Sequence, residues 1–251
     1  MLKKRVIPVL LLRGKRCVKG KRFENFRDTG DPVMATRVYN AQAADELVFL
    51  DIDATNEGRP PSLDILEKVS EEAFMPFTFG GGIRTIEDVR RALAAGADKV
   101  AITTAAVLDP ELVAGVASTF GSQCVVAGID VREEGGSYAV YTHSGRRRAD
   151  IGLVDLVRRL DAAGAGEIFV NSIDRDGMMQ GFDLELVKTV AGVTKKPVIV
   201  CGGAGNYGHL VEAFRAGAHA VACASLFHFG DNNPPRVRAA LKNAGFPVKD
   251  I

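Results

Sequence analysis

The 251-residue sequence predicts one α/β domain, a (β/α)8 barrel built from two repeated half-barrels at approximately 1–121 and 122–251. Three observations support this fold. Motifs recur at a fixed distance, short apolar runs rich in β-forming residues occur eight times, and helix-like segments separate these runs. The repeat is clearest where Gly82 corresponds to Gly203 and Gly96 to Gly217, because both pairs lie 121 residues apart.

Near the start of each half, the correspondence continues with a slightly shorter offset of 119 residues, which pairs Leu11 with Asp130. The repeat therefore places an aliphatic residue in one half where the other half carries an acid.

Each predicted strand is a nearly continuous apolar run, the pattern of a parallel sheet that helices cover. The runs are Val6–Leu12, Glu46–Leu50, Phe77–Phe79, Lys99–Ile102, Val125–Ile129, Glu167–Val170, Pro197–Val200 and Ala220–Ala222. A closed barrel requires eight strands, so we favour it over an open doubly wound sheet.

Amphipathic segments between these runs predict the helices. One covers residues 62–69 and opens with Ser62 as its expected N-cap, and another covers residues 85–93 and ends before Gly96. No Pro-rich or low-complexity stretch divides the chain. We therefore expect the two halves to form a single domain.

The composition narrows the classes of partner. Hydrophobic residues make up 47% of the chain. The net charge is only +1, so the protein has no general electrostatic attraction for nucleic acid or an anionic membrane. No window approaches the roughly 18 consecutive apolar residues that span a bilayer. The four cysteines form no CxxC pair, which argues against a metal site or disulfide framework. We expect a cytoplasmic protein with no metal and no other cofactor.

Loops rich in glycine and hydroxyl groups follow four predicted strands, at the barrel end where functional loops gather. Gly82 and Gly203 lie in loops whose bare backbone can offer N–H groups to an anion. Thr104 and Ser225 add hydroxyls at helix N-termini, which favour phosphate. The alternative is that these glycines only form tight turns. Because all four positions follow the repeat, we predict a ligand with phosphate at both ends.

Acidic residues also follow the predicted strands, namely Asp51, Asp53, Asp130, Asp174 and Asp176. A carboxylate at this end can serve as general acid or base if its surroundings adjust its pKa. Alternatively, Asp51, Asp53 and Asp174 hold loop backbone in Asx turns. Asp130 is the best catalytic candidate.

A polar segment from Arg13 to Asp31, which includes Lys19, separates the first strand from the first helix. An irregular segment of this length in a compact domain is commonly functional. We predict that it closes over an anionic ligand, the alternative being a solvated loop without a role.

Several specific motifs are spread over the whole chain without large gaps. They are Val18-Lys19-Gly20, Phe23 to Pro32, Asp45 to Ile52, Gly80 to Ile83, Gly121 to Gln123, Ser172 to Gly177 and Phe227 to Phe229. Together they resemble the cyclase subunit family of imidazole glycerol phosphate synthase. The resemblance implies a (β/α)8 barrel with a glutaminase subunit docked at its bottom face. It also implies that ammonia crosses the barrel to a phosphoribulosyl formimino carboxamide substrate, giving imidazole glycerol phosphate and an aminoimidazole carboxamide ribotide.

At the top of the barrel, the resemblance assigns catalytic roles to two residues. Asp130 matches one of two catalytic aspartates, and Lys19 matches a mobile catalytic loop. The positions that match phosphate contacts are Gly82, Thr104, Gly177, Gly203 and Ser225.

At the bottom, the resemblance implies an ammonia gate made of alternating charges. Its positions are Arg5, Glu46, Lys99 and Glu167, all of the required type. The positions that match the glutaminase interface are Asp98 and Gln123.

The second catalytic aspartate of the family falls at position 11, where this chain has Leu11. Leucine transfers no proton, and a positioned acid or base contributes about a hundredfold to ten-thousandfold to a rate. Further departures gather near the predicted mouth: Thr103 for an expected Asn, Asn171 for a Thr, Met178 for a Thr, Cys201 for a Ser and Gly14 for an Asp. This pattern indicates changed chemistry at the substrate end with the ammonia end retained.

Two functions follow from this pattern. The one we favour is a paralogue with doubtful cyclase turnover that supplies ammonia to a third, amidine-forming enzyme, which acts on a nucleotide sugar in surface-polysaccharide synthesis of the O-antigen type. The alternative is a histidine-pathway cyclase in which Asp130 and water carry the acid–base chemistry. Both have a glutaminase subunit and a bis-phosphorylated ligand or phosphate as partners, and neither involves nucleic acid or a membrane.

Overall fold

A computed structural model describes residues 3–249, so the outermost residues of the predicted domain, 1–2 and 250–251, lie outside the described part. Within residues 3–249, eight parallel strands close into a barrel because β7 pairs with β10. These strands are β1 (Arg5–Arg13), β4 (Leu47–Asp51), β5 (Phe77–Gly80), β6 (Lys99–Ile102), β7 (Val125–Glu134), β10 (Glu167–Ser172), β11 (Val198–Cys201) and β12 (Ala220–Cys223). The predicted (β/α)8 barrel is confirmed, and each predicted run overlaps one of its strands.

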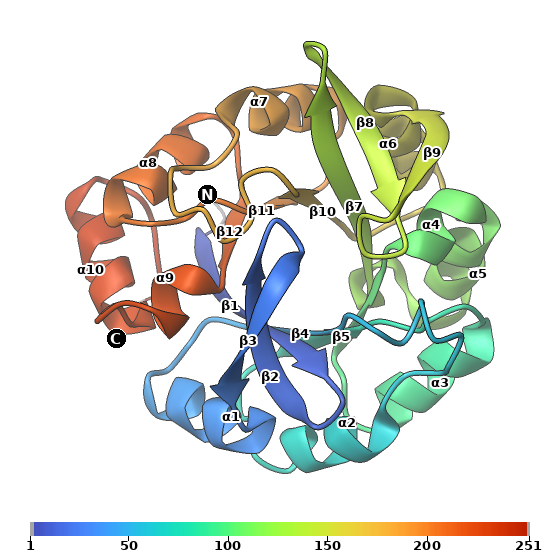
Figure 1. Cartoon of the computed structure of the whole chain (residues 1–251), viewed down its shortest axis with the longest axis horizontal. Coiled ribbons are helices and arrows are strands. Elements are labelled where there is room, and N and C mark those ends of the chain that lie inside the picture. The colour runs from blue at the N-terminus through green and yellow to red at the C-terminus, as the bar shows by residue number, and fades with distance from the viewer. Residues whose placement is uncertain (1–2, 250–251) are drawn as a thin grey trace.

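Helices surround the barrel on its outer side (Figure 1). The longer ones are α1 (Pro32–Ala41), α2 (Leu63–Ser70), α3 (Ile86–Ala94), α5 (Pro110–Phe120), α6 (Leu153–Ala162), α7 (Leu184–Val193), α8 (Tyr207–Arg215) and α10 (Pro234–Asn243). Short turns α4 (Thr104–Leu108), α9 (Ser225–His228) and the 3-10 helix η1 (Ser122–Cys124) complete the set described. None of these helices is both long and apolar enough to cross a bilayer.

Two antiparallel hairpins extend the sheet, each after the first strand of a half-barrel. β1 continues into β2 (Arg16–Lys21) and β3 (Glu24–Gly30), and β7 continues into β8 (Ser137–Thr142) and β9 (Arg147–Gly152). We expected an irregular segment over 13–31 and no strands over 137–152. Most residues of β2, β3 and β9 are polar or glycine and give little strand signal, whereas β8 (Ser-Tyr-Ala-Val-Tyr-Thr) is rich in β-forming residues and was missed; all four strands extend the protruding ends of β1 and β7 by pairing.

The two halves also share a strand register. On β1 and β4, Leu11 lies opposite Leu50, and on β7 and β10, Asp130 lies opposite Asn171. Both pairs occupy the same place in their half-barrel. One half therefore presents two leucines where the other presents an acid and an amide.

Side-chain capping explains where one of the two predicted helices begins. Thr85 forms a capping box at α3, since its hydroxyl accepts from the Asp88 N–H at 3.0 Å and the Asp88 carboxylate accepts from the Thr85 N–H. Ser62 occupies the N-cap position of α2 as predicted, but its hydroxyl makes no cap bond there. That hydroxyl donates instead to the Asp51 carboxylate at 2.6 Å.

The apolar core has two layers because side chains alternate along each strand. Outward-facing residues such as Leu10 and Phe49 pack under the helices, while Val48, Val126 and Phe169 fill the barrel interior.

A buried arginine ties the last helix to the first strands. Arg238 of α10 is 1% exposed and donates to the Ala43 carbonyl at 2.8 Å and to Asp45 at 3.3 Å. Asp45 in turn accepts from the Val6 N–H at 3.0 Å. The carboxylate of Asp45 thus depends on Arg238 for its counter-charge.

We expect Arg238→Leu to lower the free energy of unfolding by about 3 kcal/mol, because it leaves Asp45 buried without its partner. Urea denaturation measures this loss. Arg236→Leu, which replaces an exposed arginine of the same helix, serves as the control and should have little effect. Equal losses in the two variants would contradict the importance of the buried pair.

Candidate active site at the barrel mouth

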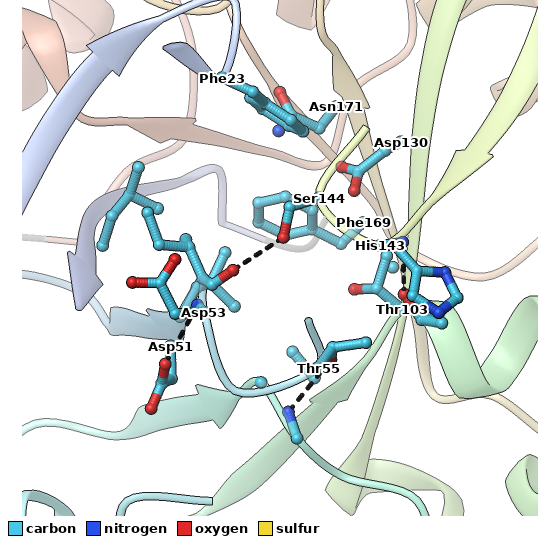
Figure 2. Close-up of a pocket in the computed structure, with 18 of the residues that line it drawn as sticks. Phe23, Asp51, Asp53, Thr55, Thr103, Asp130, His143, Ser144, Phe169 and Asn171 are labelled. Carbon is cyan, nitrogen blue, oxygen red and sulfur yellow. Dashed lines mark hydrogen bonds between the residues drawn. The ribbon is translucent and has the colours of Figure 1, made fainter. Parts of the chain in front are cut away.

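A cavity of about 420 Å³ opens at the carboxyl ends of the barrel strands (Figure 2). Several predicted site residues line it: Lys19, Gly82, Thr104 and Asp130. A small adjoining hollow is lined by Lys19 and by three further predicted residues, Gly177, Gly203 and Ser225. The structure therefore gathers the predicted phosphate positions into two groups, with Lys19 between them.

Glycine is required in the loop after β11. Gly203 has φ 114°, which disfavours side chains, and a Cβ there would come within 2.1 Å of the Gly181 carbonyl oxygen. The Ser225 hydroxyl beside this loop is buried and has no hydrogen-bond partner among residues 3–249. An unsatisfied buried hydroxyl next to bare backbone is a suitable contact for a phosphate oxygen.

The hairpin of β2 and β3 lies across the barrel mouth (Figure 1). At its tip, Arg22 and Phe23 have φ of 52° and 64°, and the Arg22 N–H donates to the Asp176 carbonyl at 2.8 Å. This contact brings Lys19 of β2 to Asp176, whose carboxylate oxygens lie 2.7 and 2.8 Å from the Lys19 ammonium. The segment predicted to close over a ligand is thus a hairpin that lies over the mouth, with a buried ion pair beneath it.

Asp130 faces the cavity from β7, and protein surrounds its carboxyl on the other sides. Burial raises the pKa of Asp130 to about 7, and the charge of Asp176 adds to this rise, while a hydrogen bond from the Asn171 side chain acts in the opposite direction. A carboxyl with this pKa can accept and release protons near neutral pH.

The wall of the cavity contributed by β1 and β4 is apolar. Leu11 packs in the interior cluster with Val9 and Val48, and lines the cavity together with its register neighbour Leu50. In the described residues of β1, nothing replaces the missing carboxylate, since the neighbouring Arg13 is paired with Asp53 at 3.0 Å.

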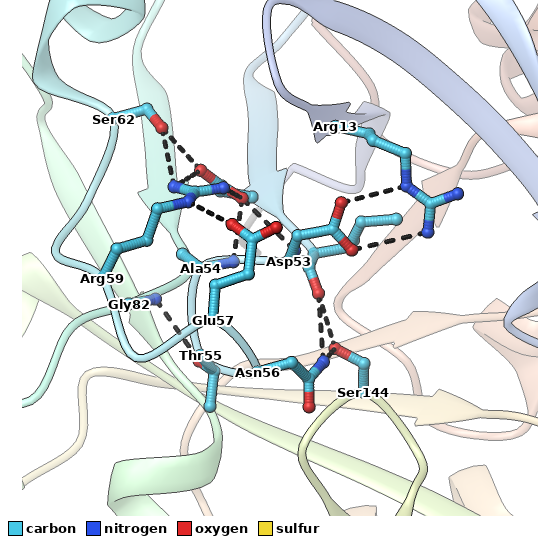
Figure 3. A network of polar contacts seen from close by, with 12 residues as sticks. Arg13, Asp53, Ala54, Thr55, Asn56, Glu57, Arg59, Ser62, Gly82 and Ser144 are labelled. Carbon is cyan, nitrogen blue, oxygen red and sulfur yellow. Dashed lines mark hydrogen bonds and ion pairs between the residues drawn. The ribbon is translucent and has the colours of Figure 1, made fainter.

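The other acidic residues of the mouth have structural partners, and Figure 3 shows the one of Asp53, which pairs with Arg13. Asp51 accepts from the Ala54 N–H at 3.1 Å as in an Asx turn, and it also binds the Arg59 guanidinium at 2.6 and 2.8 Å. Asp174 accepts from the Glu133 N–H at 2.9 Å. These contacts agree with the alternative that Asp51 and Asp174 hold loop structure. Within residues 3–249, no cationic side chain is bound directly to Asp130.

A ring of charges closes the opposite end of the barrel. The Lys99 ammonium contacts Glu46 at 2.9 Å and Glu167 at 2.8 Å, and Arg5 contacts Glu46 at 2.7 Å and also Glu167. Burial alone would lower the pKa values of Arg5 and Lys99, but the two carboxylates outweigh it and raise them. The four predicted residues therefore form a fully paired ring without net charge.

The residues predicted for a partner interface lie beside this ring. Asp98 and Gln123 are both exposed near the amino ends of β6 and β7. On the same end, before β5, Phe74 is 84% exposed. Phe74 was not predicted from the sequence, since its exposure depends on the turn between α2 and β5.

Sequence analysis also left two cavity residues without a role. Asn171 was noted only as a departure from the family, and His143 was not considered, although both line the cavity. The positions of these residues follow from the β7–β10 pairing and from the β8–β9 hairpin. Nowhere in residues 3–249 do three or more His, Cys, Asp or Glu side chains group as metal ligands.

Comparisons with known proteins agree with this architecture. A family model described as histidine biosynthesis protein matches residues 5–233. The chain is 48% identical over 250 residues to the imidazole glycerol phosphate synthase subunit HisF of Gluconacetobacter diazotrophicus, covering 99% of this chain and 97% of the relative. Similar subunits from Caulobacter vibrioides (48% identity, 99% and 97% coverage) and Hyphomonas neptunium (47%, full coverage of both) also match.

We expect Asp130→Asn to become more stable relative to the wild type as pH rises from 4 to 8. The folded state holds the Asp130 proton up to about pH 7, whereas the unfolded chain releases it near pH 4, so the wild type loses stability across this range. The expected relative gain is roughly 2–4 kcal/mol. Urea denaturation at several pH values measures it, with the exposed Asp150→Asn as control. A stability difference that does not change with pH would contradict this account of the carboxyl.

Proposed function

Because the chain belongs to the histidine biosynthesis protein family, we propose that it is the ammonia-using subunit of an imidazole glycerol phosphate synthase. One observation carries this proposal. A single barrel has a paired charge ring at one end and, at the other, a carboxyl whose pKa is about 7 inside a ligand-sized cavity.

The bottom of the barrel suits ammonia. The ring of Arg5, Glu46, Lys99 and Glu167 has two cations and two anions that neutralise each other. Above it, the barrel interior is apolar, as at Phe169. In such surroundings, neutral ammonia has a far smaller desolvation penalty than the ammonium ion. We therefore assign the ring as the ammonia gate.

The mouth suits a ligand with two phosphate groups. Gly82 and Thr104 supply backbone and hydroxyl groups at one side of the large cavity, and Gly177, Gly203 and Ser225 do so around the adjoining hollow. A phosphoribulosyl formimino carboxamide substrate carries phosphate at both ends, so its central atoms would lie near Asp130 and Lys19.

Asp130 is the proposed acid and base of the reaction. Because Leu11 supplies no second acid at this cavity, the carboxyl of Asp130 would have to both accept and return protons. A pKa near 7 permits this. Lys19 is held by Asp176 and contributes positive charge at the hairpin. The products would be imidazole glycerol phosphate and aminoimidazole carboxamide ribotide.

The names of the relatives favour this histidine-pathway cyclase over the surface-polysaccharide paralogue that we expected from the sequence. A second candidate function rests on Leu11 alone. In it, the barrel conducts ammonia from the glutaminase but transfers it to an acceptor other than the phosphoribulosyl substrate.

The bottom face is the proposed docking surface for the glutaminase. Asp98 and Gln123 offer polar groups there, and exposed Phe74 offers a large apolar anchor on the same end of the barrel. Aromatic residues of this kind commonly dominate the binding energy of an interface.

The test of function is steady-state turnover of the phosphoribulosyl substrate with saturating ammonium. The wild type should turn over, and Asp130→Asn should reduce kcat at least about a hundredfold, because it removes the acid–base group. Leu11→Asp should raise kcat by about tenfold to a hundredfold, because it supplies a second one.

The control is Leu50→Asp, which introduces an acid at the neighbouring register position and should not raise turnover. Absence of turnover in both the wild type and Leu11→Asp, with the substrate still bound, would contradict the cyclase and favour transfer of ammonia to another acceptor.

We expect Phe74→Ala to weaken binding of a purified glutaminase subunit of an imidazole glycerol phosphate synthase by about tenfold to a hundredfold. The reason is the loss of an exposed aromatic ring that the proposed complex would bury, and calorimetric titration measures the change in affinity. Phe229→Ala, at an aromatic residue 52% exposed next to α9, is the control. Equal affinities of the wild type and Phe74→Ala for the glutaminase would show that Phe74 does not contribute to the interface.

A further inference from the structure

The loop after β11 is held from behind by a histidine that does not line the site. The Gly205 N–H donates to His209 Nδ1 at 3.2 Å. The His209 N–H donates in turn to the side-chain oxygen of Asn206, the N-cap of α8, at 3.1 Å. His209 is half-buried and lines neither the large cavity nor the adjoining hollow. Its imidazole therefore acts on the loop and not on a ligand.

The repeat places a carboxylate where this histidine stands. His209 corresponds to Asp88 of the first half-barrel, because the two lie 121 residues apart. The Asp88 carboxylate accepts from the Arg84 N–H at 3.0 Å, and Arg84 corresponds to Gly205 at the same offset. The two half-barrels thus hold the same backbone group, one with an anion and the other with an imidazole. A ring nitrogen that accepts a hydrogen bond carries no proton, so this imidazole is uncharged.

Gly205 belongs to a close-packed loop at the edge of the hollow. Gly203, two residues before it, lines the hollow, and its carbonyl accepts from the Gly181 N–H at 2.8 Å. A Cβ on Gly205 would come within 2.1 Å of the Met179 carbonyl oxygen. The bond to His209 therefore fixes the far end of a loop whose near end already packs against its neighbour.

An uncharged acceptor suits this position because of the anion that the hollow is proposed to hold. The Ser225 hydroxyl in the hollow is buried and has no partner within residues 3–249. A carboxylate behind the loop would repel a phosphate there, and an imidazole holds the same N–H group without that repulsion. In the first half-barrel, Arg84 lines the cavity and offers a cation near Asp88, whereas its counterpart Gly205 has no side chain.

We propose that His209 is a positioning residue of this hollow: it holds the loop of residues 203–205 with an acceptor that adds no negative charge. The proposal rests on the proposed function, which places a ligand phosphate in the hollow, and adds a residue that does not touch the ligand. An uncharged polar side chain at position 209 should then support phosphate binding, whereas an apolar or an anionic one should not.

Inorganic phosphate is the probe, and NMR titration of the full chain measures its binding. The backbone amide signals of Gly203 and Gly205 report the dissociation constant at the hollow, and those of Gly82 and Thr104 report it at the other side of the mouth. His209→Leu should raise the first constant about tenfold and leave the second unchanged, because only the loop after β11 loses a contact.

Two further variants separate the acceptor from the charge. His209→Asn places an uncharged oxygen close to the position of Nδ1 and should keep the constant within about threefold of the wild type. His209→Asp keeps an acceptor but adds an anion, so it should weaken binding by about threefold to tenfold, and added salt should reduce that loss. Hydrogen exchange at the Gly205 amide should be faster in His209→Leu alone. Glu212→Gln, at an exposed position of α8, is the control and should change neither constant.

Unchanged phosphate binding at the hollow in folded His209→Leu would overturn the inference while the proposed function stands. An equal loss on both sides of the mouth would overturn it as well. If His209→Leu does not fold, His209→Asn and His209→Asp decide, since equal constants in these two variants would exclude the role of charge. If phosphate shifts neither amide signal at the wild-type hollow, the proposed phosphate site fails and the inference fails with it.

Discussion

The parallel direction of the barrel strands is the constraint on which the rest of this molecule depends. Because every strand begins at one end and side chains alternate, residues two apart on each strand stack along the barrel interior. β10 shows the result in three residues: Glu167 in the charge ring, Phe169 in the apolar interior and Asn171 at the cavity. The strand that contributes to the charge ring thus also contributes to the wall of the cavity, and the length of the strand sets the distance between the two.

The hairpin of β2 and β3 depends on the same geometry, since it grows from the end of β1 that protrudes at the mouth. Its tip holds Arg22 and Phe23 in the left-handed region, which costs on the order of 1 kcal/mol for each residue. The buried contact between Lys19 and Asp176 lies beneath this tip and brings a cation to the cavity.

Much of the fold could be predicted from the sequence, because the repeat and the apolar runs can both be seen in the sequence without knowledge of any contact. The ends of Lys99–Ile102 were predicted correctly, and the ring residues were identified by their resemblance to a family before their contacts were known. The hairpins were not predicted, since polar segments such as 16–30 become strands only by pairing with β1 and with each other. Ser62 is the N-cap residue as predicted, but the sequence did not show that its hydroxyl donates to Asp51, eleven residues earlier, instead of accepting from the helix backbone. Asn171 gained meaning only when pairing placed it beside Asp130.

The shared register of the two halves gives Leu11 its physical meaning. Leu11 and Leu50 occupy in the first half the places that Asp130 and Asn171 occupy in the second. A symmetrical barrel would offer acid–base groups on both sides of a ligand, whereas this one offers hydrogen bonds and proton transfer from one side and apolar contact from the other. In the proposed reaction, proton transfer would therefore run through one carboxyl, and burial together with the nearby charge of Asp176 raises the pKa of that carboxyl to about 7. Because these two causes act without any group at position 11, the raised pKa of Asp130 does not depend on a second acid in the first half-barrel.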